Sequence, residues 1–266
     1  MKITIIKLKR YARLRGILAL VAIFATACSK KNDPTPKQDT PPPSGSTVPY
    51  YTLERVENLP DSLSDSDPTA TQLPFYFSLA YKQVQPASYN KTTYWDICFS
   101  GIYNSFMSGN SGSNSTNAGY QGPGKGGIII VAQDFNDVTD VPSDSQFQTG
   151  AAVVGTDGKG AFAATLTTVG WYLYDYGGDV VGDGSADKQH VAYALGNAMK
   201  LADGSTLPAR TVIVKMGNGD YAKIRMISCY KNAFTPDQMF INTPHMFFTF
   251  EYVIVPAGST KFTIKN

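Results

Sequence analysis

Short apolar segments are the feature that most constrains the fold of this chain. From Tyr50 onward, runs rich in Tyr, Phe, Thr and Val alternate with Gly, Asn, Asp and Pro, and no stretch sustains a helical period. β-Branched and aromatic residues favour strands, whereas glycine and proline favour the turns between them. The sequence therefore predicts an all-β fold of many antiparallel strands with little helix.

The clearest element is a hairpin in which Gly217-Asn218-Gly219-Asp220 forms the turn between two apolar strands. The aromatic segment "PHMFFTFEYVIV" predicts a strand in the middle of a sheet. Residues 105–127 are rich in Gly, Ser and Asn and predict a long surface loop. We expect strands over residues 50–56, 73–83, 92–100, 127–133, 161–168, 170–176, 189–195, 209–217, 220–230, 246–255 and 260–265.

Residues 1–28 are typical of a lipoprotein signal peptide. Six basic residues and no acidic residue precede an apolar stretch, residues 17–25, that is too short to cross a bilayer. The small residues before Cys28 resemble a lipobox, in which the cysteine is acylated, although Ala25 stands where leucine is usual. The alternative is an ordinary signal peptide with a free cysteine nearby. We predict that Cys28 is lipidated and attaches the protein to a membrane.

Residues 29–49 predict a disordered tether. Six prolines stand among Lys, Asp, Ser and Thr, with no apolar residue before Val48. Such a composition cannot bury enough surface to offset the entropy of ordering. Residues 50–266 are then a single β domain, since their number is within the range of one all-β unit.

The charge balance argues against nucleic acid as a partner. The chain has 23 basic and 21 acidic residues, and six of the basic ones lie in residues 1–15. Cleavage before Cys28 leaves 17 basic against 21 acidic residues, with no basic stripe. Nucleic-acid binding depends on clustered Lys and Arg that neutralise phosphates.

No enzymatic motif is complete. "GYQGPGKGG" lacks the hydroxyl residue that follows the lysine of a phosphate-binding loop, and the β-branched run at 128–131 predicts a strand instead of a helix. No G-x-S-x-G is present, and neither His190 nor His245 has the context of a catalytic base. His245, just before the aromatic strand, looks structural. The acidic loop 179–187 lacks calcium-loop spacing and is typical of a solvated turn.

Cys98 and Cys229 both lie in expected strands. Either they are buried free thiols or they form a disulfide, which an exported protein allows. The sequence leaves both alternatives open.

Several segments together resemble the HmuY family of haem-binding outer-membrane lipoproteins of Gram-negative anaerobes. Their order along most of the folded part carries the resemblance. The segments are "TYWDICFSG" at 93–101, "GKGG" at 124–127, "FNDVTDVPSD" at 135–144, "GWYLYD" at 170–175, "RTVIVKMGNGDYAKIRMISCYK" at 210–231 and "FFTFEYV" at 247–253.

The resemblance implies a hand-shaped all-β fold in which a hairpin and loops grip haem. It also implies two axial iron ligands, His or Met, from two loops that flank the "GWY" strand. The first loop, residues 150–170, contains no His, Met, Tyr or Cys. The second, residues 175–208, holds His190, Tyr193 and Met199.

We therefore predict His190 and Met199 as candidate iron ligands, with Tyr193 and Tyr176 as further haem contacts. His190 can alternatively be an exposed or hydrogen-bonded strand residue, and methionine often fills gaps in a core. Tyr172, Tyr174 and Tyr176 alternate along a strand and share one face. That face either stacks on a porphyrin or sugar ring or packs within the protein.

The resulting interpretation is a non-catalytic haem-capturing lipoprotein anchored in the outer membrane at the cell surface. Its expected partners are haem and, beyond it, a TonB-dependent outer-membrane haem receptor or host haemoproteins. The alternative is a lipid-anchored binding or adhesion module on the same fold that has lost haem coordination and recognises glycan, peptide or protein. The first loop, which offers no iron ligand, favours that alternative.

Overall fold

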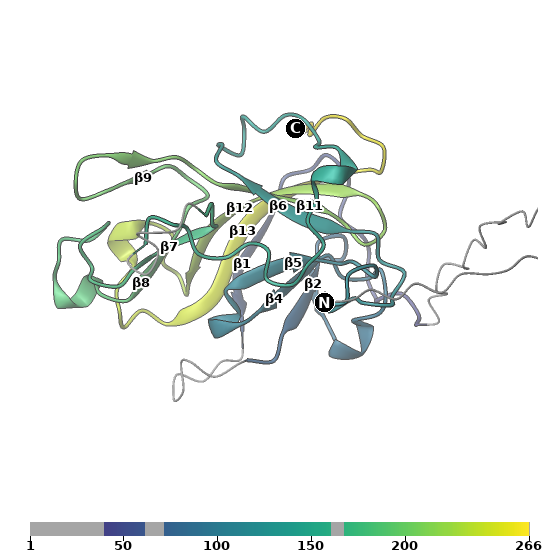
Figure 1. Ribbon diagram of the computed structural model, residues 1–266, viewed down its shortest axis with the longest axis horizontal. Helices are drawn as coiled ribbons and strands as arrows, with labels where there is room; N and C mark the ends of the chain where they lie inside the picture. The colour runs from purple at the N-terminus through teal and green to yellow at the C-terminus, as the bar shows by residue number, and fades with distance from the viewer. Residues whose placement is uncertain (1–39, 62–71, 161–167, 266) are drawn as a thin grey trace, which may run out of the picture. The chain divides into compact units, whose positions relative to one another are not determined.

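A computed structural model describes residues 40–61, 72–160 and 168–265. Within these ranges the chain forms strands and short 3-10 turns, with no longer helix, so the predicted all-β class is confirmed (Figure 1). The strands are β1 (Glu54–Pro60), β2 (Phe75–Ser78), β3 (Gln83–Gln85), β4 (Ile97–Ser100), β5 (Phe106–Gly109), β6 (Gly127–Val131), β7 (Tyr172–Asp175), β8 (Val191–Ala194), β9 (Met199–Lys200), β10 (Thr206–Leu207), β11 (Thr211–Lys215), β12 (Tyr221–Tyr230) and β13 (His245–Val255). The 3-10 turns are η1 (Ala87–Tyr89), η2 (Ile102–Asn104), η3 (Asp144–Gln146), η4 (Ala186–Lys188) and η5 (Pro236–Gln238).

Two antiparallel sheets form the main body. The larger has the strand order β1-β13-β12-β11-β6, and the smaller has the order β3-β2-β4-β5. Two separate hairpins, β7-β8 and β9-β10, complete the described part. Figure 1 shows β7 and β8 beside the end of the large sheet where the yellow strand β13 begins.

The core lies between the two sheets and follows the two-residue period of a strand. Phe248, Phe250 and Tyr252 on β13 are fully buried on one face. The Phe248 and Phe99 ring centroids lie 4.6 Å apart, and those of Phe250 and Phe77 lie 5.5 Å apart. These aromatic pairs join the large sheet to the small one. They stabilise the packing of the two sheets, because burial of aromatic surface is a main source of folding free energy.

The two strongest strand predictions are confirmed. β11 and β12 form the expected hairpin, with Lys215 paired to Tyr221 and Gly219 at φ 99° in the turn. β13 lies between β1 and β12 and is therefore an interior strand. The β11-β12 segment combines an alternating apolar pattern with a Gly-Asn-Gly turn, and β13 is a long aromatic run.

Other strand predictions are wrong or incomplete. Residues 260–265 form only a single bridge, between Lys261 and Asp140. β5 lies inside the segment that we predicted to be a loop, because the short apolar pair Phe106-Met107 pairs with β4. Of the strand predicted at 161–168, residues 161–167 lie outside the described residues.

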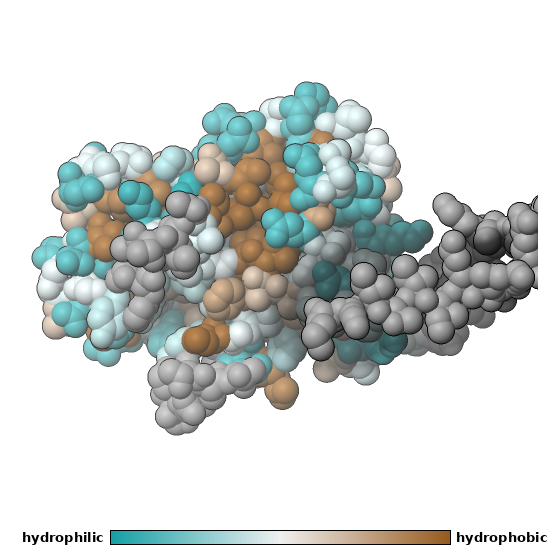
Figure 2. All heavy atoms as spheres, in the orientation of Figure 1, coloured by the Kyte–Doolittle hydropathy of each residue, from teal (hydrophilic) through white to brown (hydrophobic). Residues whose placement is uncertain are grey.

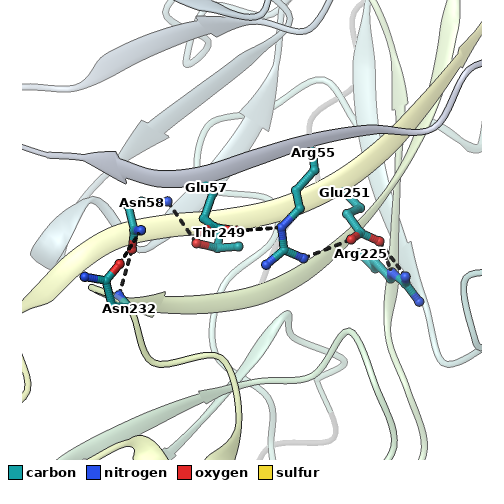
Figure 3. A network of polar contacts seen from close by, with 7 residues as sticks. All are labelled: Arg55, Glu57, Asn58, Arg225, Asn232, Thr249 and Glu251. Atoms are coloured by element: carbon teal, nitrogen blue, oxygen red, sulfur yellow. Dashed lines mark hydrogen bonds and ion pairs between the residues drawn. The ribbon is translucent and has the colours of Figure 1, made fainter.

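A polar network crosses the exposed face of β1, β13 and β12 (Figure 3). Glu251 on β13 accepts hydrogen bonds from Arg55 Nη1 at 2.9 Å and from Arg225 Nε at 2.8 Å. Further along, the Asn58 side chain exchanges hydrogen bonds with Asn232 at the β-bulge of β1. Opposite charges directly across a sheet stabilise its register.

The "GKGG" loop owes its glycines to close backbone packing. A Cβ on Gly126 would lie 2.4 Å from the Lys215 carbonyl oxygen, and one on Gly124 would lie 2.2 Å from the Asn110 side chain. Lys125 between them is exposed. The loop is therefore a tight connection to β6.

The predicted signal peptide, Cys28 and residues 29–39 of the tether lie outside the described residues. Residues 40–49 have no strand or helix, and the Val48 amide donates to the Ala80 carbonyl at 2.8 Å. No helix among the described residues has the length and apolar character needed to cross a membrane.

Cys98 and Cys229 are buried free thiols and form no disulfide with each other. Cys98 packs in a small cluster with Trp95 and Tyr76, whereas Cys229 belongs to the main core. The structure thus selects the first of the two alternatives that the sequence left open.

Candidate functional site

A cavity of about 670 Å³ opens beside the β7-β8 hairpin. This volume is within the usual range for small-molecule sites. The polar lining consists mainly of imidazoles and phenols, from His190, His245, Tyr103, Tyr172, Tyr174 and Tyr230. The apolar lining comes from Ile102, Phe106, Trp171, Ala192, Ile241 and Met246.

His190 stands at the loop end that enters β8. Its backbone has φ 59°, and its amide donates to the Tyr176 carbonyl at 3.2 Å. The imidazole Nδ1 lies 2.8 Å from the Tyr174 hydroxyl, and the Tyr176 ring meets it edge-on at 4.7 Å between centroids. His190 is exposed and also lines the cavity, so the cavity reaches solvent at this imidazole.

Asp175 shapes the loop that carries His190. Its buried carboxylate accepts hydrogen bonds from the backbone amides of Asp179, Val180, Val181 and Gly182. A carboxylate that accepts hydrogen bonds from several successive backbone amides stabilises a tight loop.

No group of three or more His, Cys, Asp or Glu capable of holding a metal ion occurs among the described residues.

The tyrosine row on β7 turns partly toward the cavity. Tyr172 and Tyr174 line it, while Tyr176, 48% exposed, lies past the strand end against His190. Burial raises the pKa of both Tyr172 and Tyr174. These phenols therefore stay neutral and can donate hydrogen bonds.

The structure does not bring Tyr193 to the cavity. β7 and β8 pair Leu173 with Tyr193 and Tyr174 with Ala192. Residues that are directly opposite share a face, so Ala192 faces the cavity and Tyr193 points into the core with Leu173. Tyr193 is fully buried, and burial raises the pKa of its phenol to about 12.

Met199 is also placed in the core. It pairs with Leu207 in the β9-β10 hairpin, is 7% exposed and does not line the cavity. Of the four predicted haem contacts, the structure therefore brings together His190 and Tyr176 and leaves Tyr193 and Met199 elsewhere.

His245, which we expected to be structural, lines the same cavity as His190. It is the first residue of β13, and its ring lies 5.5 Å from Tyr103 and 6.3 Å from Tyr230 between centroids. Sequence reasoning missed it because it is far from the "GWY" strand along the chain. The available signal was that the chain has only two histidines.

The loop at 150–170 contributes to the cavity without offering an iron ligand. Thr156 and Gly160 line the cavity from this loop. A buried ion pair, Arg210 Nε to Asp157 Oδ2 at 2.9 Å, holds the base of the loop. Asp157 also accepts from the Gly170 amide at 3.1 Å.

Three residues of the lining adopt left-handed backbone conformations. Tyr103 has φ 52°, His190 has φ 59° and Met246 has φ 57°. Such conformations cost about 1 to 3 kcal/mol each and concentrate at functional sites. Their gathering around one cavity marks it as the candidate site.

Cys229 also lines the cavity, but its thiol is not a suitable metal ligand. Burial raises the pKa of Cys229 to about 12, so the thiol stays protonated at neutral pH. Metal ligation and nucleophilic attack both require the thiolate.

A second cavity, of about 650 Å³, lies on the other side of Phe106 and Thr156, which line both. It includes Ile129 and Ile130 of β6, where Figure 2 shows apolar residues gathered. Its described lining contains no His, Met or Cys. It therefore offers no side chain that haem iron commonly takes.

Fold and site together define an all-β protein with an aromatic cavity that carries two imidazoles. The family model described as HmuY protein matches residues 71–242. The chain belongs to the HmuY family. His190 lies inside the matched segment, and His245 lies just outside it.

Two solved structures are similar over most of the chain. The apo HmuY analogue of Tannerella forsythia is 12% identical, with a TM-score of 0.33, and covers 77% of this chain and 95% of its own. A candidate lipoprotein of Bacteroides fragilis is 11% identical, with a TM-score of 0.30, and covers 80% and 96%. Among curated proteins no sequence matches significantly.

Proposed function

We propose that this protein binds haem in the cavity around His190 and acts as a carrier without catalysing a reaction. The observation that most supports the proposal is the position of His190. It is the one histidine within the segment matched by the HmuY family, and it lines a cavity of about 670 Å³. The resemblance of the sequence to haem-binding lipoproteins points to the same residue.

The residues of the cavity fit an iron porphyrin. Aromatic and aliphatic side chains offer the apolar surface that a porphyrin ring needs, and neutral histidine is a common axial ligand. When Nδ1 of His190 donates its hydrogen to the Tyr174 hydroxyl oxygen, the lone pair lies on Nε2, which is the nitrogen that an iron would take. The tyrosines add aromatic ring faces that can stack on the ligand.

The lining is less suited to a bare metal ion. Protein sites for bare transition-metal ions use three or four side-chain ligands, and no such group occurs among the described residues. A porphyrin supplies four nitrogens of its own, so that one or two imidazoles are sufficient. Bound haem would bring the redox and ligand-binding chemistry of its iron, while the protein provides binding and solvent exclusion.

Membrane attachment through Cys28 and delivery of haem to a receptor belong to the same proposal. A lipidated Cys28 followed by the proline-rich residues 29–49 would hold the β domain at a distance from the outer membrane. Haem would come from host haemoproteins and pass to a TonB-dependent receptor. Mass spectrometry of the N-terminal peptide tests the anchor, and an unmodified Cys28 thiol would refute it.

Titration of the purified protein with haemin tests haem binding. We expect a sharpened, red-shifted Soret band that saturates at one equivalent, and a clear loss of affinity in His190→Ala. Tyr172→Phe is the matched control, because it removes a hydroxyl from the same cavity without touching His190. A spectrum of unchanged free haemin would refute the proposal.

One observation favours the alternative of a glycan-, peptide- or protein-binding module. The loop at 150–170 contributes Thr156 and Gly160 to the cavity but no iron ligand. If haemin fails to bind, a glycan and host-protein array is the next measurement. Binding there that Tyr174→Ala abolishes would assign the cavity to that second class of ligand.

A further inference from the structure

Both histidines of the chain line one cavity. His190 enters it from the loop before β8, and His245 enters it from the first position of β13. The chain contains no other histidine. Two imidazoles that converge from distant parts of the sequence are the basis of the inference.

Three tyrosines of the cavity lining lie beside the two histidines. On one side, Tyr103 packs against His245, and the Tyr174 hydroxyl lies 2.8 Å from Nδ1 of His190. On the other side, Tyr230 stands opposite His245 in the β12-β13 ladder. The Tyr230 hydroxyl oxygen accepts a hydrogen bond from the Ala192 backbone amide at 2.9 Å, and Ala192 lies two residues after His190. Both imidazoles thus have tyrosine neighbours in the lining of the same cavity.

The tautomer of His245 suits it to bind a metal. Its Nδ1 lies 3.3 Å from the Thr243 carbonyl oxygen. A carbonyl oxygen can only accept, so Nδ1 carries the proton and the lone pair resides on Nε2. A backbone carbonyl on Nδ1 is the arrangement that commonly orients metal-binding histidines.

We propose that His245 is a second iron ligand, so that haem iron in this cavity takes one imidazole from β13 and one from the loop before β8. This inference rests on the proposed function. It explains how haem iron could have two protein ligands although residues 150–170 contain no side chain that iron commonly takes. It also assigns the role to a residue beyond the segment that the family model matches.

Spectroscopy of the haemin complex tests the inference. We expect the wild-type ferric complex to be six-coordinate and low-spin. The haemin complex of His245→Ala should become high-spin, and its affinity for haemin should fall by about 10- to 100-fold or more. Losses of that size already occur when a group that only orients a metal ligand is removed. His245→Met should restore six-coordination with a His/Met spectrum. Failure of wild-type protein to bind haemin refutes the proposed function, whereas binding with an unchanged His245→Ala spectrum refutes only this inference.

A second measurement keeps the inference testable if the variants do not fold. Histidine-selective labelling gives two imidazole signals, since the chain has two histidines. Haemin should shift both signals far outside their normal range, and metal-free protoporphyrin should shift neither to that extent. A large shift of the His190 signal alone would overturn the role of His245.

Discussion

The Tyr174 hydroxyl lies 2.8 Å from Nδ1 of His190. The contact joins β7 to the loop that enters β8 and fixes one nitrogen of the imidazole. A partner on Nδ1 orients a ligating histidine and adjusts its basicity. This pair is therefore the local geometry on which haem binding by His190 depends.

Tyr174→Phe should weaken haemin binding by about 10- to 100-fold without unfolding the protein, the effect typical of losing the partner of a metal-binding histidine. Equilibrium titration by absorbance measures it. Tyr172→Phe, which loses a contact to Ser105 at 3.1 Å instead, should bind nearly as well as wild type. Equal losses in both variants would contradict a specific role for the Tyr174 hydroxyl.

Lys188 should fasten the His190 loop to the segment before β13. Its ammonium donates to the carbonyls of Met239 at 2.9 Å and Pro236 at 3.1 Å, and it lies 3.8 Å from the Phe240 ring centroid. Beside it, the Ile241 amide donates to the Asp187 carbonyl. Charged hydrogen bonds of this kind contribute about 1.5 to 3 kcal/mol each at most, and partial exposure reduces that.

Lys188→Met should therefore accelerate amide hydrogen exchange at Ile241 by about tenfold or more, which corresponds to about 1.4 kcal/mol of local stability. It should also speed haemin dissociation. Lys200→Met is the control, because Lys200 reaches only the exposed Gly204 carbonyl. Unchanged exchange at Ile241 would show that the two loops are held by other contacts.

Gly126→Ala should destabilise the fold. The added methyl would meet backbone oxygens of Lys215 and Asn110 at 2.4 and 2.7 Å, and backbone cannot move aside as a flexible side chain can. Overpacking of this kind costs about 1 to 3 kcal/mol. Lys125→Ala, next in the chain, should change the free energy of unfolding by less than about 0.5 kcal/mol. Denaturant unfolding compares the two, and equal stability would refute the packing account.

Asp96 should make stability depend on pH. Burial raises the pKa of its carboxyl to about 7, although the Leu79 amide donates to it at 2.8 Å. The folded state thus binds the proton more tightly than the unfolded chain does. The contribution is present below about pH 4 and is lost as the pH rises to about 7, by on the order of 4 kcal/mol.

Denaturant unfolding between pH 4 and pH 8 measures this dependence. Asp96→Asn cannot ionise, so its stability curve should be flatter across that window whatever its absolute stability. Wild-type stability that increases from pH 4 to pH 7, with the same slope in Asp96→Asn, would contradict the assignment.

The elements that the sequence predicts best are those with local signals. The β11-β12 hairpin has both an alternating apolar pattern and a Gly-Asn-Gly turn, and β13 is a long aromatic run. β5, β9 and β10 have at most four residues each and form only because a distant or neighbouring strand offers a partner. Such strands leave little trace in local sequence.

The residues of the candidate site likewise divide into those with a signal in the sequence and those placed by strand pairing. His190 follows from the family resemblance, and Tyr172 and Tyr174 share a face because strand residues alternate. Tyr193 could not be placed, since its face depends on pairing with Leu173, a one-residue choice of register. His245 reaches the cavity only through the pairing of β13 with β12, which no local pattern reveals.

A crystal structure of the haemin-loaded protein, with anomalous diffraction recorded at the iron edge, tests the central claim most directly. The account predicts one strong iron peak in the cavity, at coordination distance from Nε2 of His190. No iron peak there, or a peak only in the second cavity beside Ile129 and Ile130, would contradict it.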